Sequence, residues 1–221
     1  MVLNNVSYTK FKKYWRKTSL KNEDDGNFLL EHIVKNKPKN FLEIGIFHGV
    51  TSRNVCEILS HINGNDFKFT GIDLFFHDNE IPKDEYIPKT KFANPFKNIY
   101  YNLIIRQDPY SLKSVLKLLK KFKKNIYIIK GNSNKVLHEI SVNEFDYVFL
   151  DGGHKYETVK DDLKNLKQVI INGGLILCDD YNLTYAPGVK KAIDEYIYEN
   201  NFNLKIYNMR FAEITKKFLN N

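Results

Sequence analysis

Asp151-Gly-Gly-His154 follows the apolar segment 145–150, and Gly173-Gly-Leu-Ile-Leu-Cys-Asp-Asp-Tyr181 repeats the pattern of an apolar strand that ends in carboxylates. Between them, residues 156–171 have the apolar spacing of an amphipathic helix. Its apolar positions are Val159, Leu163, Leu166, Val169 and Ile170. Strand, helix and strand in this order form a βαβ unit with two parallel strands in one sheet. The carboxylates then meet at the carboxyl edge of the sheet, where ligands bind in open α/β folds.

The rest of the sequence continues this alternation of strands and helices. Further strands are predicted over residues 41–46, 67–73, 125–130, 203–207 and 211–215, of which the last two form a closing hairpin. Helices are predicted over residues 51–61, 112–122, 134–140 and 188–198, and an N-terminal helix ends at Pro38. We therefore expect an α/β protein with a doubly wound, seven-stranded sheet, mostly parallel, with an antiparallel C-terminal hairpin strand.

The domain organisation predicted from the sequence is one domain over residues 1–221, with a helical extension over residues 1–40. Residues 74–102 lack a clear period, and a loop of this length is often functional. Its aromatic residues are Phe75, Phe76, Tyr86, Phe92, Phe96, Tyr100 and Tyr101. They could stack on a sugar or ring substrate, pack on one another, or form an oligomer contact.

Composition narrows the class of protein. The chain has 221 residues, 43% of them hydrophobic, which is typical of a globular protein with its own core. Its two cysteines, Cys56 and Cys178, lie in apolar patterns and are expected to be buried thiols. No apolar run approaches the ~18 residues that span a membrane. The first residues lack the charged start and apolar block of a signal peptide, so we expect a cytoplasmic protein.

The formal net charge of +8 raises the question of a nucleic-acid partner. Most lysines are scattered, and the dense cluster over residues 117–124 also contains Leu118, Leu119 and Phe122. This pattern is typical of an amphipathic helix with a solvated face. A nucleic-acid partner is therefore not expected from the charge alone.

A glycine-containing turn follows the first strand, in the sequence Glu43-Ile-Gly-Ile-Phe-His-Gly49. Glycines allow a ligand to approach the backbone closely, and the N-terminus of the next helix favours a negative group. The spacing is neither the G-x-G-x-x-G dinucleotide fingerprint nor a Walker loop. Asp73 ends the second strand, where an acidic side chain can accept hydrogen bonds from ribose hydroxyls or simply cap a turn.

Together these motifs resemble the class I S-adenosylmethionine-dependent methyltransferases, which have a Rossmann-like fold, and the resemblance covers residues 40–216. The segments 151–156 and 173–181 are the most specific part. They resemble the branch that contains catechol O-methyltransferase and the macrocin-type sugar O-methyltransferases. The segment Gly131-Asn-Ser-Asn134 is similar to the part of that family that contacts adenine. The resemblance implies cofactor contacts from Glu43, Gly45, Gly49, Thr51, Asp73, Ser133, Asn134 and Asp151.

In that branch a divalent metal, usually magnesium, is held by residues that match Asp151, Asp179 and Asp180. Oxygen ligands suit magnesium better than zinc. The metal would lower the pKa of a substrate hydroxyl and orient it toward the sulfonium methyl group, which makes Asp151 part of the catalytic set. The alternative is that Asp179 and Asp180 cap the following turn while Asp151 accepts a backbone amide.

The general base is less clearly indicated. Catechol O-methyltransferases carry a lysine where this chain has His154, and some sugar enzymes use an acid at the position of Gly153. Histidine suits proton transfer near neutral pH, so His154 is the candidate base. It could equally brace the metal ligands. His48 and His77 are interpreted as ordinary surface or loop residues.

We therefore expect an O-methyltransferase that acts on a small hydroxylated molecule, such as a sugar or sugar-nucleotide, with S-adenosylmethionine and Mg²⁺. The two alternatives are a nucleic-acid methyltransferase and a non-catalytic protein with the cofactor fold. A homo-oligomer is compatible with the sequence, and a membrane partner is not expected.

Overall fold

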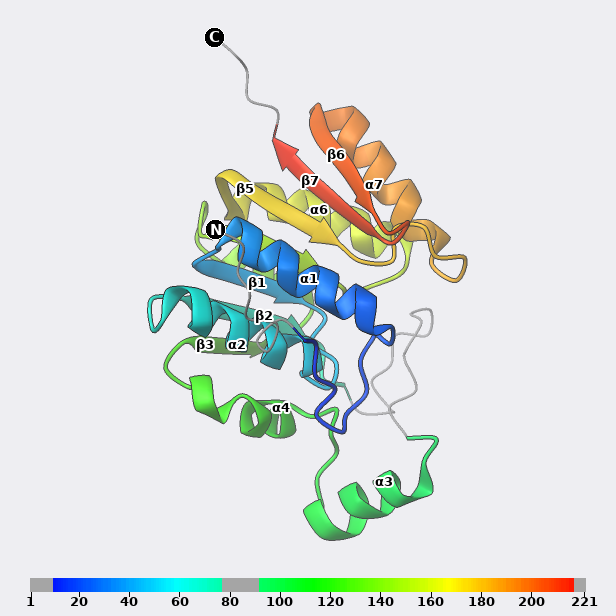
Figure 1. The fold of residues 1–221 in the computed structure, drawn as a ribbon. Helices are drawn as coiled ribbons and strands as arrows, with labels where there is room; N and C mark the ends of the chain where they lie inside the picture. Colours follow the sequence, from blue (N-terminus) through cyan, green and yellow to red (C-terminus); the bar gives the residue numbers. More distant parts are fainter. Residues whose placement is uncertain (1–9, 77–91, 217–221) are drawn as a thin grey trace.

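A computed structural model describes residues 10–76 and 92–216, and its centre is one seven-stranded sheet (Figure 1). The strands are β1 (Asn40–Ile44), β2 (Lys68–Asp73), β3 (Ile126–Lys130), β4 (Phe145–Leu150), β5 (Ile170–Cys178), β6 (Phe202–Tyr207) and β7 (Phe211–Lys216). Their order is β3-β2-β1-β4-β5-β7-β6; β7 pairs antiparallel with β5 and β6, and the other pairs are parallel. The predicted fold class is confirmed.

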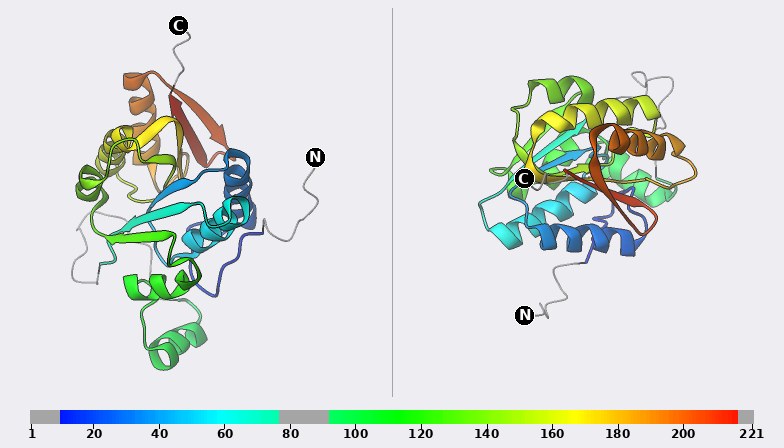
Figure 2. Two further views of the ribbon diagram at one scale, coloured as in Figure 1. Left: turned by 90° about the vertical axis from the view of Figure 1, so that its left-hand side faces the viewer. Right: turned by 90° about the horizontal axis from the view of Figure 1, so that it is seen from above.

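Helices cover both faces of the sheet (Figure 2). The α-helices are α1 (Glu23–Asn36), α2 (Val50–Asn63), α3 (Pro95–Ile99), α4 (Leu112–Leu118), α5 (Ser133–Val136), α6 (Tyr156–Val169) and α7 (Pro187–Asn200). Short turns over Lys120–Phe122 (η2) and Leu137–Glu139 (η3) extend α4 and α5. None of the helices within the described ranges combines the length and apolar character needed to cross a bilayer.

The alternating side chains of the strands build two cores. Phe41 of β1 packs in the core under α1, α2 and α4, while its neighbour Leu42 packs in the core under α6 and α7. Successive strand residues point to opposite faces, so both faces of a central strand are apolar. The sheet is thus enclosed on both faces, and its carboxyl edge remains available for a site.

The βαβ unit predicted from the sequence is present, with one difference at its second strand. Residue Ile170 was expected in the helix, but α6 ends at Val169 and Ile170 begins β5, where it pairs with Phe145. An apolar residue at this position satisfies a helical and a strand pattern equally, so periodicity could not separate them. The strand is therefore longer than the predicted apolar run.

A helical segment lies inside the region that was predicted to be an aperiodic loop. Here α3 continues into a π-helical turn, Tyr100–Ile105 (η1), and the two project away from the sheet (Figure 1). Their apolar side chains Phe96, Ile99, Leu103 and Ile104 are exposed, so they form no inward-facing stripe that would reveal a helix. Phe75, Phe92 and Tyr101 are buried, whereas Tyr86 lies outside the described residues.

Candidate functional site

The carboxyl ends of β1, β4 and β5 meet side by side. In the sheet register Ile44 pairs with Leu150, and Leu150 pairs with Cys178, so the residues that follow these strands are neighbours. Gly45 has a φ of +93°, and a Cβ at that position would lie 1.9 Å from the backbone oxygen of Asp151. Only glycine fits this close approach. The first loop and Asp151 are thereby held against each other.

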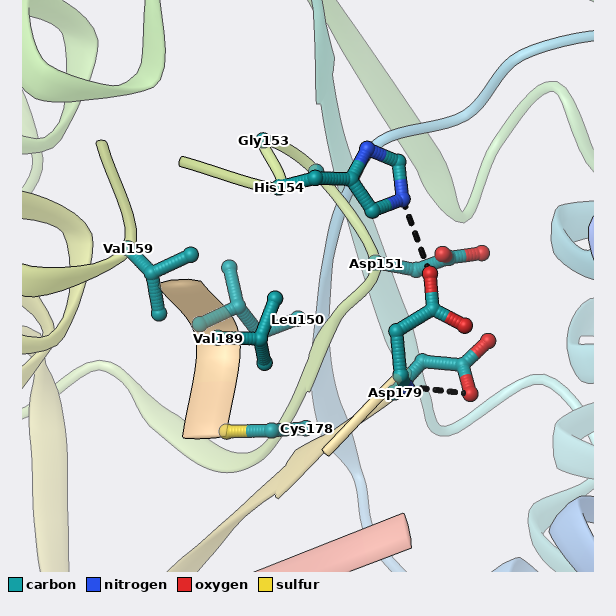
Figure 3. Close-up of a pocket in the computed structure, with 10 residues that line it drawn as sticks. Leu150, Asp151, Gly153, His154, Val159, Cys178, Asp179 and Val189 are labelled. Carbon is teal, nitrogen blue, oxygen red and sulfur yellow. Dashed lines mark hydrogen bonds and ion pairs between the residues drawn. The ribbon is translucent and has the colours of Figure 1, made fainter. Parts of the chain in front are cut away.

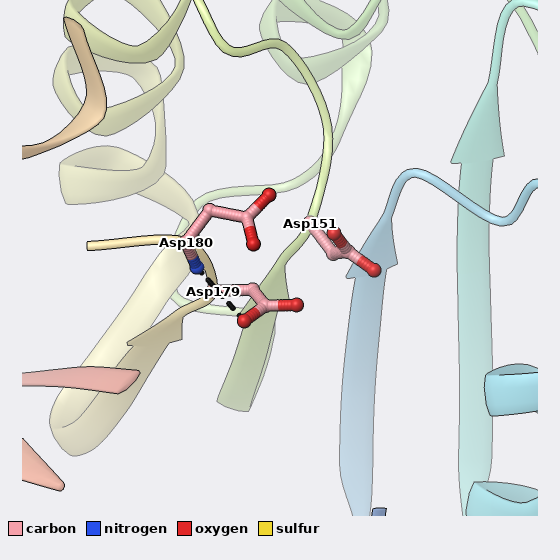
Figure 4. A group of neighbouring side chains, drawn as sticks. All are labelled: Asp151, Asp179 and Asp180. Carbon is pink, nitrogen blue, oxygen red and sulfur yellow. Dashed lines mark hydrogen bonds between the residues drawn. The ribbon is translucent and has the colours of Figure 1, made fainter. Parts of the chain in front are cut away.

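Three aspartates, Asp151, Asp179 and Asp180, converge at this edge (Figure 4). Each offers a carboxylate oxygen, and these oxygens lie within 4.8 Å of one another. Asp179 and Asp180 are buried, each 3% exposed. Asp180 has a φ of +61°, an unfavourable backbone conformation for a non-glycine residue. Such local strain, retained beside a cluster of buried acids, is common at functional sites.

Burial dominates the electrostatics of Asp151 and Asp179. It raises the pKa of Asp151 well above its ordinary value, and repulsion from Asp179 and Asp180 raises it further. The hydroxyl of Ser19, which donates to Asp151 Oδ2 at 2.6 Å, opposes this effect. Burial also raises the pKa of Asp179. The cluster therefore favours any added positive charge.

Arg210 supplies a positive charge to this cluster that was not predicted from the sequence. Its Nε donates to Asp179 Oδ1 at 2.5 Å and its Nη2 to Asp179 Oδ2 at 2.7 Å. Its Nη1 donates to Asp25 of α1 at 2.9 Å. The arginine lies in the turn between β6 and β7, 31 residues from Asp179, so only the sheet order brings the two together.

His154 contacts the third aspartate. Its Nε2 lies 2.8 Å from Asp180 Oδ2, and the ring points toward the carboxylates (Figure 3). The hydroxyl of Tyr185 donates to Asp180 Oδ1 at 2.9 Å. In this arrangement His154 braces Asp180, and a role as base requires Nδ1 or a rearrangement of the contact. Both interpretations from the sequence therefore stay open.

Glu43, at the end of β1, has a fully buried carboxylate whose two oxygens have no hydrogen-bond partner among the described residues. Burial, the largest cause, raises the pKa of Glu43 to about 8, and the charge of Asp73 raises it by a smaller amount. A buried acid without a partner is costly, so it marks a place where a ligand could supply the missing charge.

The turn after β1 leads into the N-terminus of α2. The N-cap residue of α2 is Gly49, with a φ of +74°, so no side chain caps the helix there. The first turn of α2 contains no acidic residue. Thr51 is buried there. The free amides of a helix N-terminus favour an anionic group such as a carboxylate.

The N-terminal segment covers this turn. A small hollow beside the turn is lined by Lys17, Thr18, Ser19, Gly45, Ile46, Phe47, Val50, Thr51 and Asp151. Arg16 fixes the segment through hydrogen bonds from its guanidinium to the backbone oxygens of His48, Pro109 and Ser114. The hollow thus connects the first turn to the carboxylate cluster.

Asp73 lies at the end of β2 as predicted, but its carboxylate is already surrounded by donors. The amides of Ile46 and Phe47 both donate to Oδ2 at 2.8 Å. The amide of Phe75 and the hydroxyl of Tyr110 each donate to Oδ1 at 2.9 Å. A ribose hydroxyl would have to share or displace one of these donors, and Tyr110 is the only side chain among them.

Ser133 and Asn134 begin α5, directly after β3. The side-chain oxygen of Asn134 is buried and has no hydrogen-bond partner among the described residues, whereas Asn132 caps the helix by accepting from the Asn134 amide at 2.9 Å. An unpartnered buried acceptor is suited to a donor such as an exocyclic amino group.

His48 was interpreted from the sequence as an ordinary surface or loop histidine. It lies in the turn after β1, but it is fully buried, with its ring against those of Phe47, Phe92 and Tyr110. Burial lowers its pKa to about 3, and the nearby cations Arg16 and Lys17 lower it further. His48 is thus a neutral core residue. His77, the other such candidate, lies outside the described residues.

The comparisons with known proteins place the chain in a family. The family model described as a methyltransferase domain matches residues 42–181. This segment contains the turn after β1, Asp73 and the three aspartates. The chain belongs to this methyltransferase-domain family and is a class I S-adenosylmethionine-dependent methyltransferase, as the motifs indicated. No curated protein sequence matches it.

Solved structures show the same fold. The O-methyltransferase NovP aligns with a TM-score of 0.63 at 18% identity, over 86% of this chain and 80% of that one. The methyltransferase PaMTH1 of Podospora anserina, bound to SAH, aligns with a TM-score of 0.60 at 16% identity, over 90% and 80% of the two chains. CalS11, a TDP-rhamnose 3'-O-methyltransferase, aligns with a TM-score of 0.55 at 16% identity, over 85% and 76%.

Proposed function

We propose that the protein transfers a methyl group from S-adenosylmethionine to a hydroxyl of a small molecule, with a divalent cation at the three aspartates. The observation that carries the proposal is the convergence of Asp151, Asp179 and Asp180 beside the turn after β1. This arrangement would bring an activated oxygen next to a methyl donor. A protein without catalytic function has no need to keep three acids together, two of them buried.

The residues around the first turn support binding of the methyl donor. The carboxylate of Glu43 lacks a partner, and the ammonium group of a methionine moiety would supply one. The N-terminus of α2, with Thr51, favours the carboxylate of that moiety. Asp73 is the candidate partner for the ribose and Asn134, with Ser133, for the adenine. When bound, S-adenosylmethionine supplies an electrophilic methyl group on a sulfonium.

The three aspartates suit a hard divalent cation such as Mg²⁺, because they offer only oxygen ligands and lie within 4.8 Å of one another. When bound, the cation lowers the pKa of a hydroxyl and fixes its orientation. Asp151 and Asp180 present their oxygens from two neighbouring strand ends. Asp179, whose two oxygens contact Arg210, is the most restrained of the three.

In this proposal His154 accepts the proton of the acceptor hydroxyl, and Asp180 orients His154. Their contact of 2.8 Å orients the imidazole, as a carboxylate does for a catalytic histidine. Because Gly153 offers no side chain, His154 is the candidate base of this loop. Its action as base, rather than as a brace, is a prediction.

A sugar or sugar-nucleotide is the acceptor class that we favour. NovP is described as an O-methyltransferase, and CalS11 as a TDP-rhamnose 3'-O-methyltransferase. Buried aromatic residues of segment 92–105, such as Phe92 and Tyr101, stack on each other with ring centroids 5.1 Å apart near the N-terminal segment. Their role in acceptor binding is part of the proposal. A cytoplasmic location and a homo-oligomer stay predictions.

The test is a methyl-transfer assay with purified protein, labelled S-adenosylmethionine and a panel of hydroxylated acceptors, with and without a chelator. Activity that the chelator abolishes and Mg²⁺ restores is the expected result. Activity that persists in the chelator would remove the metal from the proposal. Failure to bind SAH in calorimetry would remove the methyltransferase reaction itself.

A nucleic-acid acceptor is the second candidate because of the net charge of +8. The expected result is weak binding to RNA and DNA that salt removes without a sequence preference. Methylation of a nucleic acid in the same assay would favour this candidate over the small-molecule reaction.

A further inference from the structure

The position of Arg210 has a chemical consequence for the metal site of the proposed function, on which the following inference rests. The guanidinium makes a bidentate contact with the two oxygens of Asp179, at 2.5 and 2.7 Å, and its Nη2 also lies 3.5 Å from Asp180 Oδ1. The arginine side chain is 12% exposed and the Asp179 side chain 1%. The pair is therefore largely withdrawn from solvent, where charges interact strongly.

The formal charges of the cluster are unequal. Asp151, Asp179 and Asp180 bring three negative charges, and Arg210 brings one positive charge. Arg210 also contacts Asp25, so it offsets only part of the negative charge of the three aspartates, and a divalent cation would offset more of it. Without the arginine, the three aspartates, of which Asp179 and Asp180 are buried, would lose their guanidinium partner while still repelling one another.

Arg210 lies in the turn between β6 and β7, which contains unfavourable backbone conformations. Asn208 and Met209 have φ angles of +51° and +55°, and the second is a conformation that a methionine rarely adopts. The Arg210 amide closes the turn by donating to Tyr207 at 3.0 Å, and its carbonyl accepts from the Tyr181 amide at 2.8 Å. The second bond joins the turn to the segment that directly follows Asp180.

We propose that Arg210 acts as the counter-cation of the carboxylate cluster. It stabilises the folded protein when no metal is bound, and it limits how tightly a divalent cation binds. Asp179 Oδ1 accepts from Arg210 and also from the Asp180 amide at 2.8 Å, whereas Oδ2 accepts only from Arg210 among the described residues and keeps a lone pair, so the arginine and a cation can be bound together. The arginine is a positioning residue: it contacts the ligands and not the acceptor. The cation and Arg210 both offset the negative charge of the aspartates.

The experiment measures Mn²⁺ binding to the full chain by electron paramagnetic resonance, and thermal unfolding with EDTA or Mn²⁺. The variant R210M removes the charge while keeping a similar length. We expect it to bind Mn²⁺ at least tenfold more tightly than wild type. We also expect its Tm to fall in EDTA by several degrees and to recover with Mn²⁺, by more than the Mn²⁺ shift of wild type.

Two further variants separate charge from geometry. R210K keeps the positive charge but cannot make the bidentate contact with Asp179. Its Mn²⁺ affinity should therefore stay within about threefold of wild type, although its Tm falls. D25N removes only the partner of Arg210 on α1 and should likewise leave the affinity within about threefold. If R210M is unfolded in EDTA, we expect Mn²⁺ to refold it. The Mn²⁺ concentration needed for refolding then takes the place of the affinity measurement.

Equal or weaker Mn²⁺ binding by R210M would overturn the counter-cation role, as would a Tm that Mn²⁺ does not restore. Absence of Mn²⁺ binding in every variant would overturn the metal site and this inference together. Calorimetry of SAH with the wild-type protein tests the methyl-donor site separately, so a failed metal site is distinguishable from a failed methyltransferase.

Discussion

Replacing Glu43 with glutamine should stabilise the protein at neutral pH while weakening its binding of the methyl donor. The folded state raises the pKa of Glu43 from 4.5 to about 8, chiefly through burial, so the folded state holds this proton more strongly than the unfolded state does. Stability is therefore lost as the pH rises from 4.5 toward 8. Glutamine does not titrate and loses nothing over this range.

The size of the effect follows from the pKa change. At about 1.4 kcal/mol for each pKa unit, the ionised Glu43 costs about 5 kcal/mol at high pH, of which about 3 kcal/mol is present at pH 7. These figures are upper bounds, because the buried glutamine amide also lacks partners. We expect E43Q to gain about 1–3 kcal/mol at pH 8 and almost nothing at pH 4.5.

The assay is urea unfolding of wild type and E43Q between pH 4.5 and 9, without ligand. The difference in unfolding free energy should grow with pH and level off near pH 8. Calorimetry with SAH should show about tenfold weaker binding to E43Q, because the ammonium group loses a charged partner. Parallel stability curves, or an E43Q protein that is less stable at pH 8, would refute the reasoning.

Three other substitutions test separate parts of the site. G45A should cost more than about 3 kcal/mol in urea unfolding, because a Cβ would lie 1.9 Å from the Asp151 oxygen; a loss under about 1 kcal/mol would argue against the close approach. Y110F should bind SAH up to about tenfold more tightly by freeing one lone pair of Asp73, and weaker binding would show that the hydroxyl supports the ribose site. H154A should lower kcat about 100-fold with an unchanged Kd for SAH, and an unchanged kcat would contradict the assignment of His154 as base.

The fold could be predicted because its strands leave clear signatures. In β4 the run 147–150 is continuously apolar and buried, as expected of a strand covered on both faces, and its end at Asp151 is marked by a carboxylate and two glycines. In β5 the apolar run 175–178 likewise ends in carboxylates, Asp179 and Asp180. Since parallel strands share their carboxyl edge, the convergence of the aspartates followed from the order of the elements.

Other features depend on contacts between distant segments. Arg210 reaches Asp179 because β7 inserts between β5 and β6, and nothing near Arg210 in the sequence indicates a partner. The donors around Asp73 come from three loops, including Tyr110. His48 is buried by aromatic rings from separate segments, among them Phe92. Such packing partners are set by tertiary structure and leave no periodic pattern.

The most direct test of the central claim is a crystal structure of the protein with SAH and Mn²⁺, collected at a wavelength where manganese scatters anomalously. We predict SAH along the carboxyl edge, with its amino acid moiety at Glu43 and the N-terminus of α2. We predict an anomalous peak bounded by Asp151, Asp179 and Asp180. SAH bound elsewhere, or no anomalous density at the aspartates at saturating Mn²⁺, would contradict a metal-assisted methyl transfer at this site.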